Sequence, residues 1–257
     1  MKSGTIFIAF LALACAAAAA QTKHVDRTLP LHSNGSVSID SHNGSITVDT
    51  WDRNEIEIHA RVEAGGSSAS DRRRFDETNV EIEGSGDSVR IKTVMPDWNF
   101  SWWGNDSGNS PEVHYTVKAP RTARWTLRDH NSHIELHDLR AALEVSTHNG
   151  RLNVTNLAGP LALEMHNGRA SVEFAAFTGE SHVDTHNAEV ELSLPSNSRF
   201  NLNVSGHNQS FHSDFSVMTR MSSWHGRRDS QIEGPVNGGG PTLRLSSHNG
   251  GFRLRAR

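Results

Sequence analysis

The dipeptide His-Asn occurs seven times in this chain, and its spacing limits the folds that the chain can adopt. Its histidines are His42, His130, His148, His166, His186, His207 and His248. From His130 to His207 the copies lie 18, 18, 20 and 21 residues apart, and the last gap is about twice as long, with His225-Gly226 as a degenerate copy inside it. A period near 20 residues indicates stacked repeats, in which each unit buries its apolar face against its neighbours.

Apolar and polar residues alternate around these dipeptides, which is the pattern of strands with one buried face. The alternation is clear in Leu143-Glu144-Val145, Leu152-Asn153-Val154 and Val190-Glu191-Leu192. Hydrophobic residues are only 35% of the chain, but this regular placement argues against disorder. After residue 20 no segment keeps apolar residues at helical spacing for three turns. The best helical candidate is short and covers residues 70–78. The chain is therefore predicted to be all-β.

The residues after each histidine predict a sharp change of chain direction, since Asn and Gly adopt positive φ at little cost. The predicted turn residues are Asn43, Gly44, Asn149, Gly150, Asn167, Gly168, Asn249 and Gly250. We favour a β-solenoid or flattened β-roll of 18–21-residue repeats with a corner at each Asn-Gly. A sandwich of stacked hairpins fits the same pattern, with Thr147 facing Leu152 across a two-residue turn. The sequence leaves both architectures open.

Three segments are expected along the chain. Residues 1–20 resemble a secretory signal peptide, with Lys2, an apolar stretch and a run of alanines before a cleavage at Gln21. Residues 21–120 form an irregular β region with a Trp-rich loop at 96–111. Residues 121–257 form the regular repeat region, continuous with the part before it.

This organisation predicts an exported protein of the periplasm, the cell surface or the medium. The apolar part of residues 1–20 is too short to span a bilayer, and no transmembrane span is predicted elsewhere. Cys15 is the only cysteine, so the chain after the signal has no disulfide, thiolate metal site or cysteine nucleophile. Attachment of a lipid to Cys15 is the alternative to a free exported chain. The net charge of −4 excludes a nucleic-acid-binding class, which needs a positive face.

Several segments together resemble the putative-adhesin family of exported bacterial β-strand-repeat proteins, a domain of unknown function. They are Asn43-Gly44-Ser45-Ile46-Thr47-Val48, Trp51-Asp52, Ile56-Glu57-Ile58, Val113-His114-Tyr115-Thr116-Val117-Lys118-Ala119-Pro120, Leu192-Ser193-Leu194-Pro195 and Gly238-Gly239-Gly240-Pro241-Thr242-Leu243-Arg244-Leu245. The resemblance implies a β-solenoid-like fold and a location in the cell envelope, and it supplies no catalytic residues. The histidine before each Asn departs from the family, which has small or apolar residues there.

The repeated histidines are candidate metal ligands. If the units stack in register, His130, His148, His166 and His186 form a column with a spacing of ~4.8 Å, beside a column of asparagines that hydrogen-bond along the stack. Neighbouring imidazoles could then share a Zn²⁺, Cu²⁺ or Ni²⁺ ion, with water or a carboxylate such as Asp184 completing the shell. The alternative is that each histidine only packs beside its turn. No other cofactor is predicted.

The indoles of Trp98, Trp102 and Trp103 lie in a polar loop and form a candidate binding surface. Flat aromatic rings in such a setting stack on sugars or dock against proteins. The predicted partners are therefore envelope glycans or proteins. The alternative is that the loop covers one open end of the repeat stack, since repeat proteins need such caps.

Carboxylates provide the only candidate catalytic groups, because polysaccharide-cleaving β-helices use two or three of them on one face. The candidates are Asp40, Asp49, Asp52, Asp129, Asp138 and Asp184. Their alternation with apolar residues and their turn positions explain them as solvated groups, so no enzyme is predicted. The sequence favours a scaffold or adhesin-like interaction surface. A divalent-metal-binding protein that uses the histidine column is the alternative, and a carbohydrate-active enzyme is third.

Overall fold

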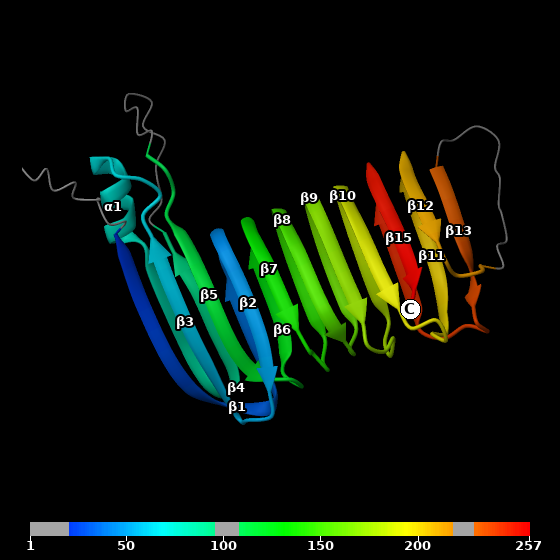
Figure 1. Ribbon diagram of the computed structural model, residues 1–257, viewed down its shortest axis with the longest axis horizontal. Coiled ribbons are helices and arrows are strands. Elements are labelled where there is room, and N and C mark those ends of the chain that lie inside the picture. The colour runs from blue at the N-terminus through cyan, green and yellow to red at the C-terminus, as the bar shows by residue number, and fades with distance from the viewer. Residues whose placement is uncertain (1–20, 96–107, 218–228) are drawn as a thin grey trace, which may run out of the picture.

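The computed structural model describes residues 21–95, 108–217 and 229–257, which form a large mixed β-sheet of fifteen strands with one short helix. The prediction of an all-β chain is confirmed. The strands lie side by side along the longest axis of the molecule, from β1, β3 and β5 at one end to β13 at the other (Figure 1). The elements are β1 (Thr22–Asp40), β2 (Asn43–Trp51), β3 (Glu55–Glu63), α1 (Ala69–Glu77), β4 (Asn79–Val94), β5 (Glu112–Pro120), β6 (Arg124–Asp129), β7 (Asn131–His137), β8 (Leu143–Leu157), β9 (Leu161–Phe174), β10 (Ser181–Leu194), β11 (Phe200–His207), β12 (Gln209–Ser213), β13 (Asp229–Val236), β14 (Thr242–Ser247) and β15 (Gly250–Ala256).

The repeat region stacks parallel strands in register. Strands β8, β9 and β10 each run through one His-Asn-Gly or His-Asn-Ala sequence, and Asn167 of β9 pairs with Asn149 on one side and with Asn187 on the other. Strands β6 and β7 form the same unit interrupted at His130, with β6 on the first half of β8 and β7 on its second half. Equivalent residues of successive units therefore lie side by side.

The hairpin alternative is wrong for these units. Residues 143–147 of β8 lie between β6 and β9, while residues 151–155 lie between β7 and β9. Both edges of each half are thus occupied by neighbouring repeats, so Thr147 cannot pair with Leu152 across a turn. The His-Asn-Gly sequences are corners within a strand path, with each half paired to its neighbours.

The order of repeats in space differs from their order in the sequence. Strands β14 and β15 pair with β10, whereas β11 and β12 pair on the far sides of β14 and β15. After β10 the chain first forms β11 and β12, which do not pair with β10. It then adds β13 antiparallel to β11, and finally forms β14 and β15 between β10 and the pair β11 and β12. This insertion accounts for the long interval before His248. The proposed degenerate copy at His225-Gly226 lies outside the described residues.

The N-terminal region joins the same stack. Residues 36–40 of β1 pair in parallel with β6, and β2 pairs in parallel with β7, so the corner at His42 lies beside the corner at His130. Strand β3 pairs antiparallel with β1 and with β5, which in turn pairs with β2. These strands connect the two halves of the repeats at the N-terminal end of the molecule (Figure 1).

The core consists of rows of equivalent apolar side chains from successive strands. One row lies before the corners and contains Ile39, Leu127, Val145, Leu163, Val183 and Leu245; another lies after them and contains Ile134, Leu152, Ala170, Val190 and Phe252. Each of these side chains is at most 2% exposed, and all belong to one hydrophobic cluster. Burial of identical positions in every unit fixes the register, because a shift by one residue would turn each row toward water.

The predicted helix is present and begins one residue earlier than expected. Ser68 caps it: its hydroxyl accepts a hydrogen bond from the backbone of Asp71, and the Asp71 carboxylate accepts one from the backbone of Ser68. This reciprocal cap stabilises a helix start. Among the described residues, no helix has the length and apolar character needed to cross a bilayer.

Candidate functional site: the histidine–asparagine ridge

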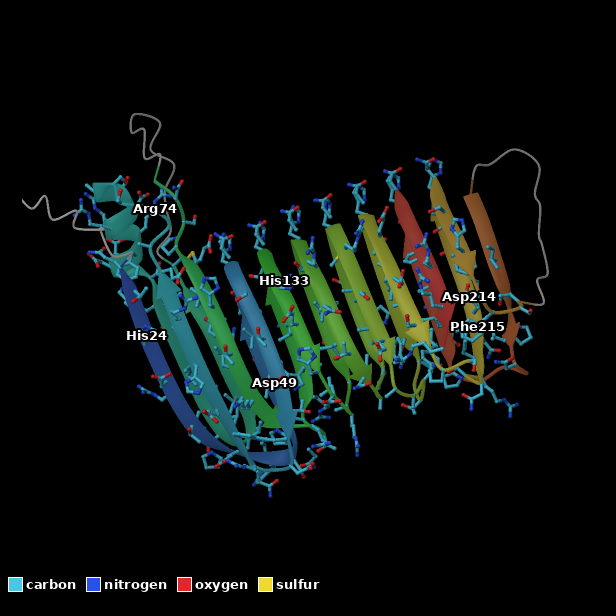
Figure 2. All side chains as sticks on the ribbon, viewed as in Figure 1. His24, Asp49, Arg74, His133, Asp214 and Phe215 are labelled. Carbon is cyan, nitrogen blue, oxygen red and sulfur yellow. The ribbon has the colours of Figure 1, made fainter. Side chains whose placement is uncertain are left out.

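All seven His-Asn dipeptides lie in one continuous row, which we call the ridge. The imidazole rings stack in the order His42, His130, His148, His166, His186, His248 and His207. Their centroids are 4.5 to 5.7 Å apart, with angles of 3° to 26° between ring planes. All seven side chains are exposed. Figure 2 shows side chains repeating at regular intervals along the row of strands.

The asparagines beside these histidines form a second row that runs the length of the ridge. Each side-chain amide donates to the amide oxygen of its neighbour, as in the bonds of 2.9 Å from Asn149 to Asn131 and 2.8 Å from Asn167 to Asn149. The ladder continues through Asn43, Asn187, Asn249 and Asn208 with bonds of 2.9 to 3.3 Å. All six bonds point in the same direction, and such chains polarise and strengthen one another.

Parallel in-register pairing produces both rows. Neighbouring strands lie ~4.8 Å apart, so identical side chains at identical positions repeat at that distance. Glycine after the asparagine allows the backbones to approach at the corner: a Cβ on Gly168 would lie 2.0 Å from the carbonyl oxygen of Gly150. Gly44 and Gly168 also have positive φ angles of 127° and 129°. The predicted turn residues thus all lie at corners, and these two glycines need their conformational freedom.

An open groove of about 850 Å³ runs beside the ridge. Its lining includes the ridge histidines from His130 onward and the carboxylates Asp129, Glu164 and Asp184. Glu164 and Asp184 are exposed, whereas Asp129 is 8% exposed. The Asp129 carboxylate accepts hydrogen bonds from the backbone and hydroxyl of Ser132 and from the hydroxyl of Thr147. Burial raises the pKa of Asp129, and the bonds from Ser132 partly oppose that shift.

The pKa of His42, the first ring of the ridge, is lowered. Partial burial is the main cause, and the neighbouring His130 imidazole adds to it, because a second positive charge beside the ring is unfavourable. The Asp129 and Asp40 carboxylates act in the opposite direction. At neutral pH the ridge at this end therefore favours a neutral ring, which can donate from one nitrogen and accept at the other.

Coordination of a metal by the ridge requires some ring movement. Two nitrogens bound to one Zn²⁺ at tetrahedral geometry lie about 3.4 Å apart, which is less than every centroid separation in the ridge. Neighbouring rings would have to tilt toward each other, and each ion would take two imidazoles. Within the described residues, the one group of three donors with ligand atoms inside 4.8 Å is Glu63, Glu112 and His114, which includes no ridge histidine.

The structure brings the four predicted column histidines together and adds three more. His42, His207 and His248 join them. The same His-Asn dipeptide marks all seven positions, but the column was predicted only for four consecutive, nearly evenly spaced copies. Trp98, Trp102 and Trp103 lie outside the described residues. The prediction that these indoles form a binding surface therefore remains a prediction.

The candidate catalytic carboxylates do not all gather in one place: Asp40 and Asp129 both lie near His42, and the others lie elsewhere. Asp129 and Asp184 line the groove, whereas Asp52 pairs with Arg121 at 2.6 Å and Asp138 accepts a bond from Asn156. No three of the six predicted aspartates bring their ligand oxygens within 4.8 Å of one another in the described part of the chain.

Comparison with known proteins gives matches of structure only. No family model matches the chain, and no curated protein matches it. A protein from Clostridium sporogenes, described as a putative cell adhesion protein, matches over 91% of this chain and all of its own, with 7% identity and a TM-score of 0.50. A putative adhesin from Bacteroides fragilis has 11% identity and a TM-score of 0.33, covering 91% of this chain and 97% of its own.

A third match, from Parabacteroides distasonis, is described as a putative lipid binding protein. It has 10% identity and a TM-score of 0.31, covering 90% of this chain and 96% of its own. Of these three proteins, the one from Clostridium has a TM-score that indicates a shared fold.

Proposed function

We propose that this protein is an exported, non-enzymatic component of the cell envelope that acts as an adhesin-like interaction surface. Its repeats form a rigid, solenoid-like rod, and the ridge with its groove is the contact surface. The observation that supports this most strongly is the stacking of all seven His-Asn corners in one row. The resemblance of residues 1–20 to a signal peptide supports export, either as a free chain in the periplasm, at the surface or in the medium, or with a lipid on Cys15.

The repetition of the ridge favours binding over catalysis. A reaction centre needs a few different groups that converge on one point, whereas the ridge offers the same two side chains at each step of ~4.8 Å. An extended partner can follow such a row and make the same contact several times, and the gain from several weak contacts is large. No three of the candidate aspartates converge on one point in the described part of the chain.

The exposed chemistry of the groove fits a polyhydroxyl chain such as an envelope glycan. Stacking hides the ring faces from solvent and leaves the ring edges, which donate and accept hydrogen bonds. Glu164 and Asp184 provide acceptors for hydroxyl groups, and Ser146 and Ser246 provide hydroxyls of their own. The indoles of Trp98, Trp102 and Trp103 would form a second contact surface for the same class of partner.

Binding of Zn²⁺, Cu²⁺ or Ni²⁺ along the ridge is the second candidate function. The supporting observation is the close approach of neighbouring rings, with centroids 4.5 Å apart for His148 and His166, beside the Glu164 and Asp184 carboxylates. Pairs of tilted imidazoles with water or a carboxylate would give several exchangeable sites.

Two binding assays separate these functions. We expect purified wild-type protein to bind polysaccharides on a glycan array, and binding to fall at least tenfold in His148→Asn/His166→Asn or in Trp102→Ala/Trp103→Ala. Calorimetric titration with Cu²⁺ tests the second candidate, which requires heat from several sites and fewer bound ions per chain in the His148→Asn/His166→Asn variant, where the ring pairs that include His148 or His166 are lost. Absence of any glycan binding contradicts the first proposal. Cleavage of a polysaccharide that single Asp→Asn changes abolish would show an enzyme.

A further inference from the structure

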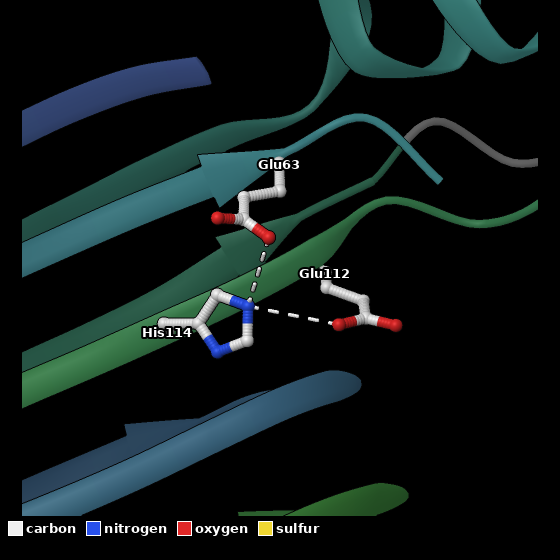
Figure 3. A group of neighbouring side chains, drawn as sticks. All are labelled: Glu63, Glu112 and His114. Carbon is white, nitrogen blue, oxygen red and sulfur yellow. Dashed lines mark ion pairs between the residues drawn. The ribbon is translucent and has the colours of Figure 1, made fainter. Parts of the chain in front are cut away.

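Beside the first corner of the ridge, where β5 pairs with β2, three side chains converge where β3 ends and β5 begins. Glu63 and Glu112 are directly opposite each other in the antiparallel pair, and His114 lies two residues after Glu112 on the same face (Figure 3). The Nε2 atom of His114 is 3.5 Å from Oε2 of Glu63 and 3.6 Å from Oε2 of Glu112. We propose that these three residues form a binding site for one divalent transition-metal ion such as Zn²⁺.

The distances fit a tetrahedral ion. Ligand atoms about 2.1 Å from Zn²⁺ at the tetrahedral angle lie about 3.4 Å from one another. The two separations from the His114 nitrogen are within about 0.2 Å of that value, and all three ligand atoms lie within 4.8 Å of one another. An ion placed between them would need only small side-chain rotations, in contrast to the stacked rings of the ridge.

The nitrogen that faces the carboxylates makes no hydrogen bond. Nε2 of His114 is buried from water and has no hydrogen-bond partner, because both carboxylates are too far away to accept one well. A buried polar atom without a partner is costly. A metal ion would satisfy this nitrogen and both carboxylates together.

Neighbouring groups orient two of the ligands. Nδ1 of His114 lies 2.9 Å from the hydroxyl of Ser45 on β2. When Nδ1 carries the proton and donates it to Ser45, the lone pair of Nε2 points between the carboxylates, as in most metal-bound histidines. Arg61 donates to Oε1 of Glu63 and leaves Oε2 for the ion.

Without an ion the arrangement costs stability. Like charges directly opposite each other in an antiparallel pair are destabilising, and Arg61 offsets only part of the charge on Glu63 and Glu112. The Glu63, Glu112 and His114 side chains are 29%, 57% and 23% exposed. Solvent can therefore reach the site and supply a water ligand at the fourth position. Two oxygens with one imidazole suit borderline ions such as Zn²⁺ better than Ca²⁺ or Mg²⁺.

Titration of metal-free protein with Zn²⁺ tests the proposal, and the His148→Asn/His166→Asn background reduces the contribution of the ridge. We expect one site per chain, weakened roughly tenfold or more by Glu112→Gln or His114→Asn. Glu135→Gln is the matched control, since it removes a carboxylate 2.9 Å from His133 on β7, where no second carboxylate completes a group of three. It should leave the affinity unchanged.

The Glu112 side chain is 57% exposed, so we expect Glu112→Gln to fold. A lower Zn²⁺ affinity of this variant can then be attributed to the lost carboxylate. We expect this variant to melt at the same or a higher temperature than wild type without metal, because it removes the repulsion with Glu63. With saturating Zn²⁺ only the wild type should gain stability. Equal Zn²⁺ affinity in wild type and Glu112→Gln, or no Zn²⁺ binding in the ridge-variant background, would overturn the proposal and leave an ion pair between His114 and the two glutamates.

Discussion

Replacement of Gly168 by alanine is expected to lower the free energy of unfolding by about 3 kcal/mol or more. Gly168 lies at a ridge corner with a φ of 129°, and an added Cβ would lie 2.0 Å from the carbonyl oxygen of Gly150 in the next strand. That contact involves backbone on both sides, so it cannot be relieved by rotation of a side chain. Ser132 and Ala188 occupy the equivalent position in other repeats without positive φ, so those corners accept a Cβ where the corner at Gly168 does not.

Gly86→Ala provides the matched control for this prediction. Gly86 also has a positive φ, 71°, but the nearest atom to its added Cβ is the His32 ring at 3.7 Å. Only the conformational cost remains there, about 1–2 kcal/mol. Urea denaturation of both variants measures the difference. Equal losses of stability in the two variants would show that the close approach of the Gly168 and Gly150 backbones adds nothing to the cost of the alanine.

Lowering the pH from 7.5 to 5.5 is expected to destabilise the protein. The pKa of His42 is lowered in the folded state, so the unfolded chain takes up a proton first, and stability falls as the pH drops below the usual histidine value of 6.5. Two neighbouring rings that both carry a proton repel by about 0.8 kcal/mol in water at ~5 Å, and the seven rings of the ridge make six such pairs. Even half of the summed repulsion would lower the free energy of unfolding by about 2 kcal/mol. Added salt should reduce this loss.

Two groups oppose this loss. The pKa of His59 is raised, mainly by its hydrogen bond to Asp26 and then by that to Glu57, so its contribution stabilises the fold at low pH and disappears as the pH rises. The raised pKa of Asp129 acts in the same sense once that carboxyl takes up a proton. We expect the ridge to dominate, because it contributes seven rings.

Melting temperatures of three proteins separate these contributions. The fall with pH should be shallower in His148→Asn/His166→Asn, which interrupts the row of charges, and steeper in His59→Gln, which loses the opposing group. A melting temperature that does not change between pH 7.5 and 5.5, or that changes equally in wild type and ridge variant, would contradict the expected repulsion.

Local pattern was sufficient to predict the strands, the changes of chain direction and part of the ridge. Alternation of apolar residues identifies buried rows such as Val145, Leu163 and Val183, because period two is a property of every half-buried strand. Asn-Gly predicts a change of direction but does not distinguish a hairpin from a corner. That choice depends on which partners occupy the two strand edges, and the partners come from other repeats.

Long-range order could not be predicted in this way. The placement of His248 between His186 and His207 depends on a strand pair that returns to fill a gap, and no local spacing encodes it. The Glu63–Glu112–His114 group was also missed. Its members belong to strands separated by α1 and β4, and only the antiparallel register of β3 and β5 brings them together.

Distances between spin labels test the central claim, that repeats stack directly on one another in the order seen. In a Cys15→Ser background, one label is attached at Asp40→Cys and the second at Asp184→Cys, Ser246→Cys or Ser205→Cys in turn. These positions are in register, four, five and six strand spacings from Asp40. Pulsed electron resonance should therefore give distances of roughly 19, 24 and 29 Å. A distance to Ser205 shorter than that to Ser246, or no regular increase along the series, would contradict the stacked ridge.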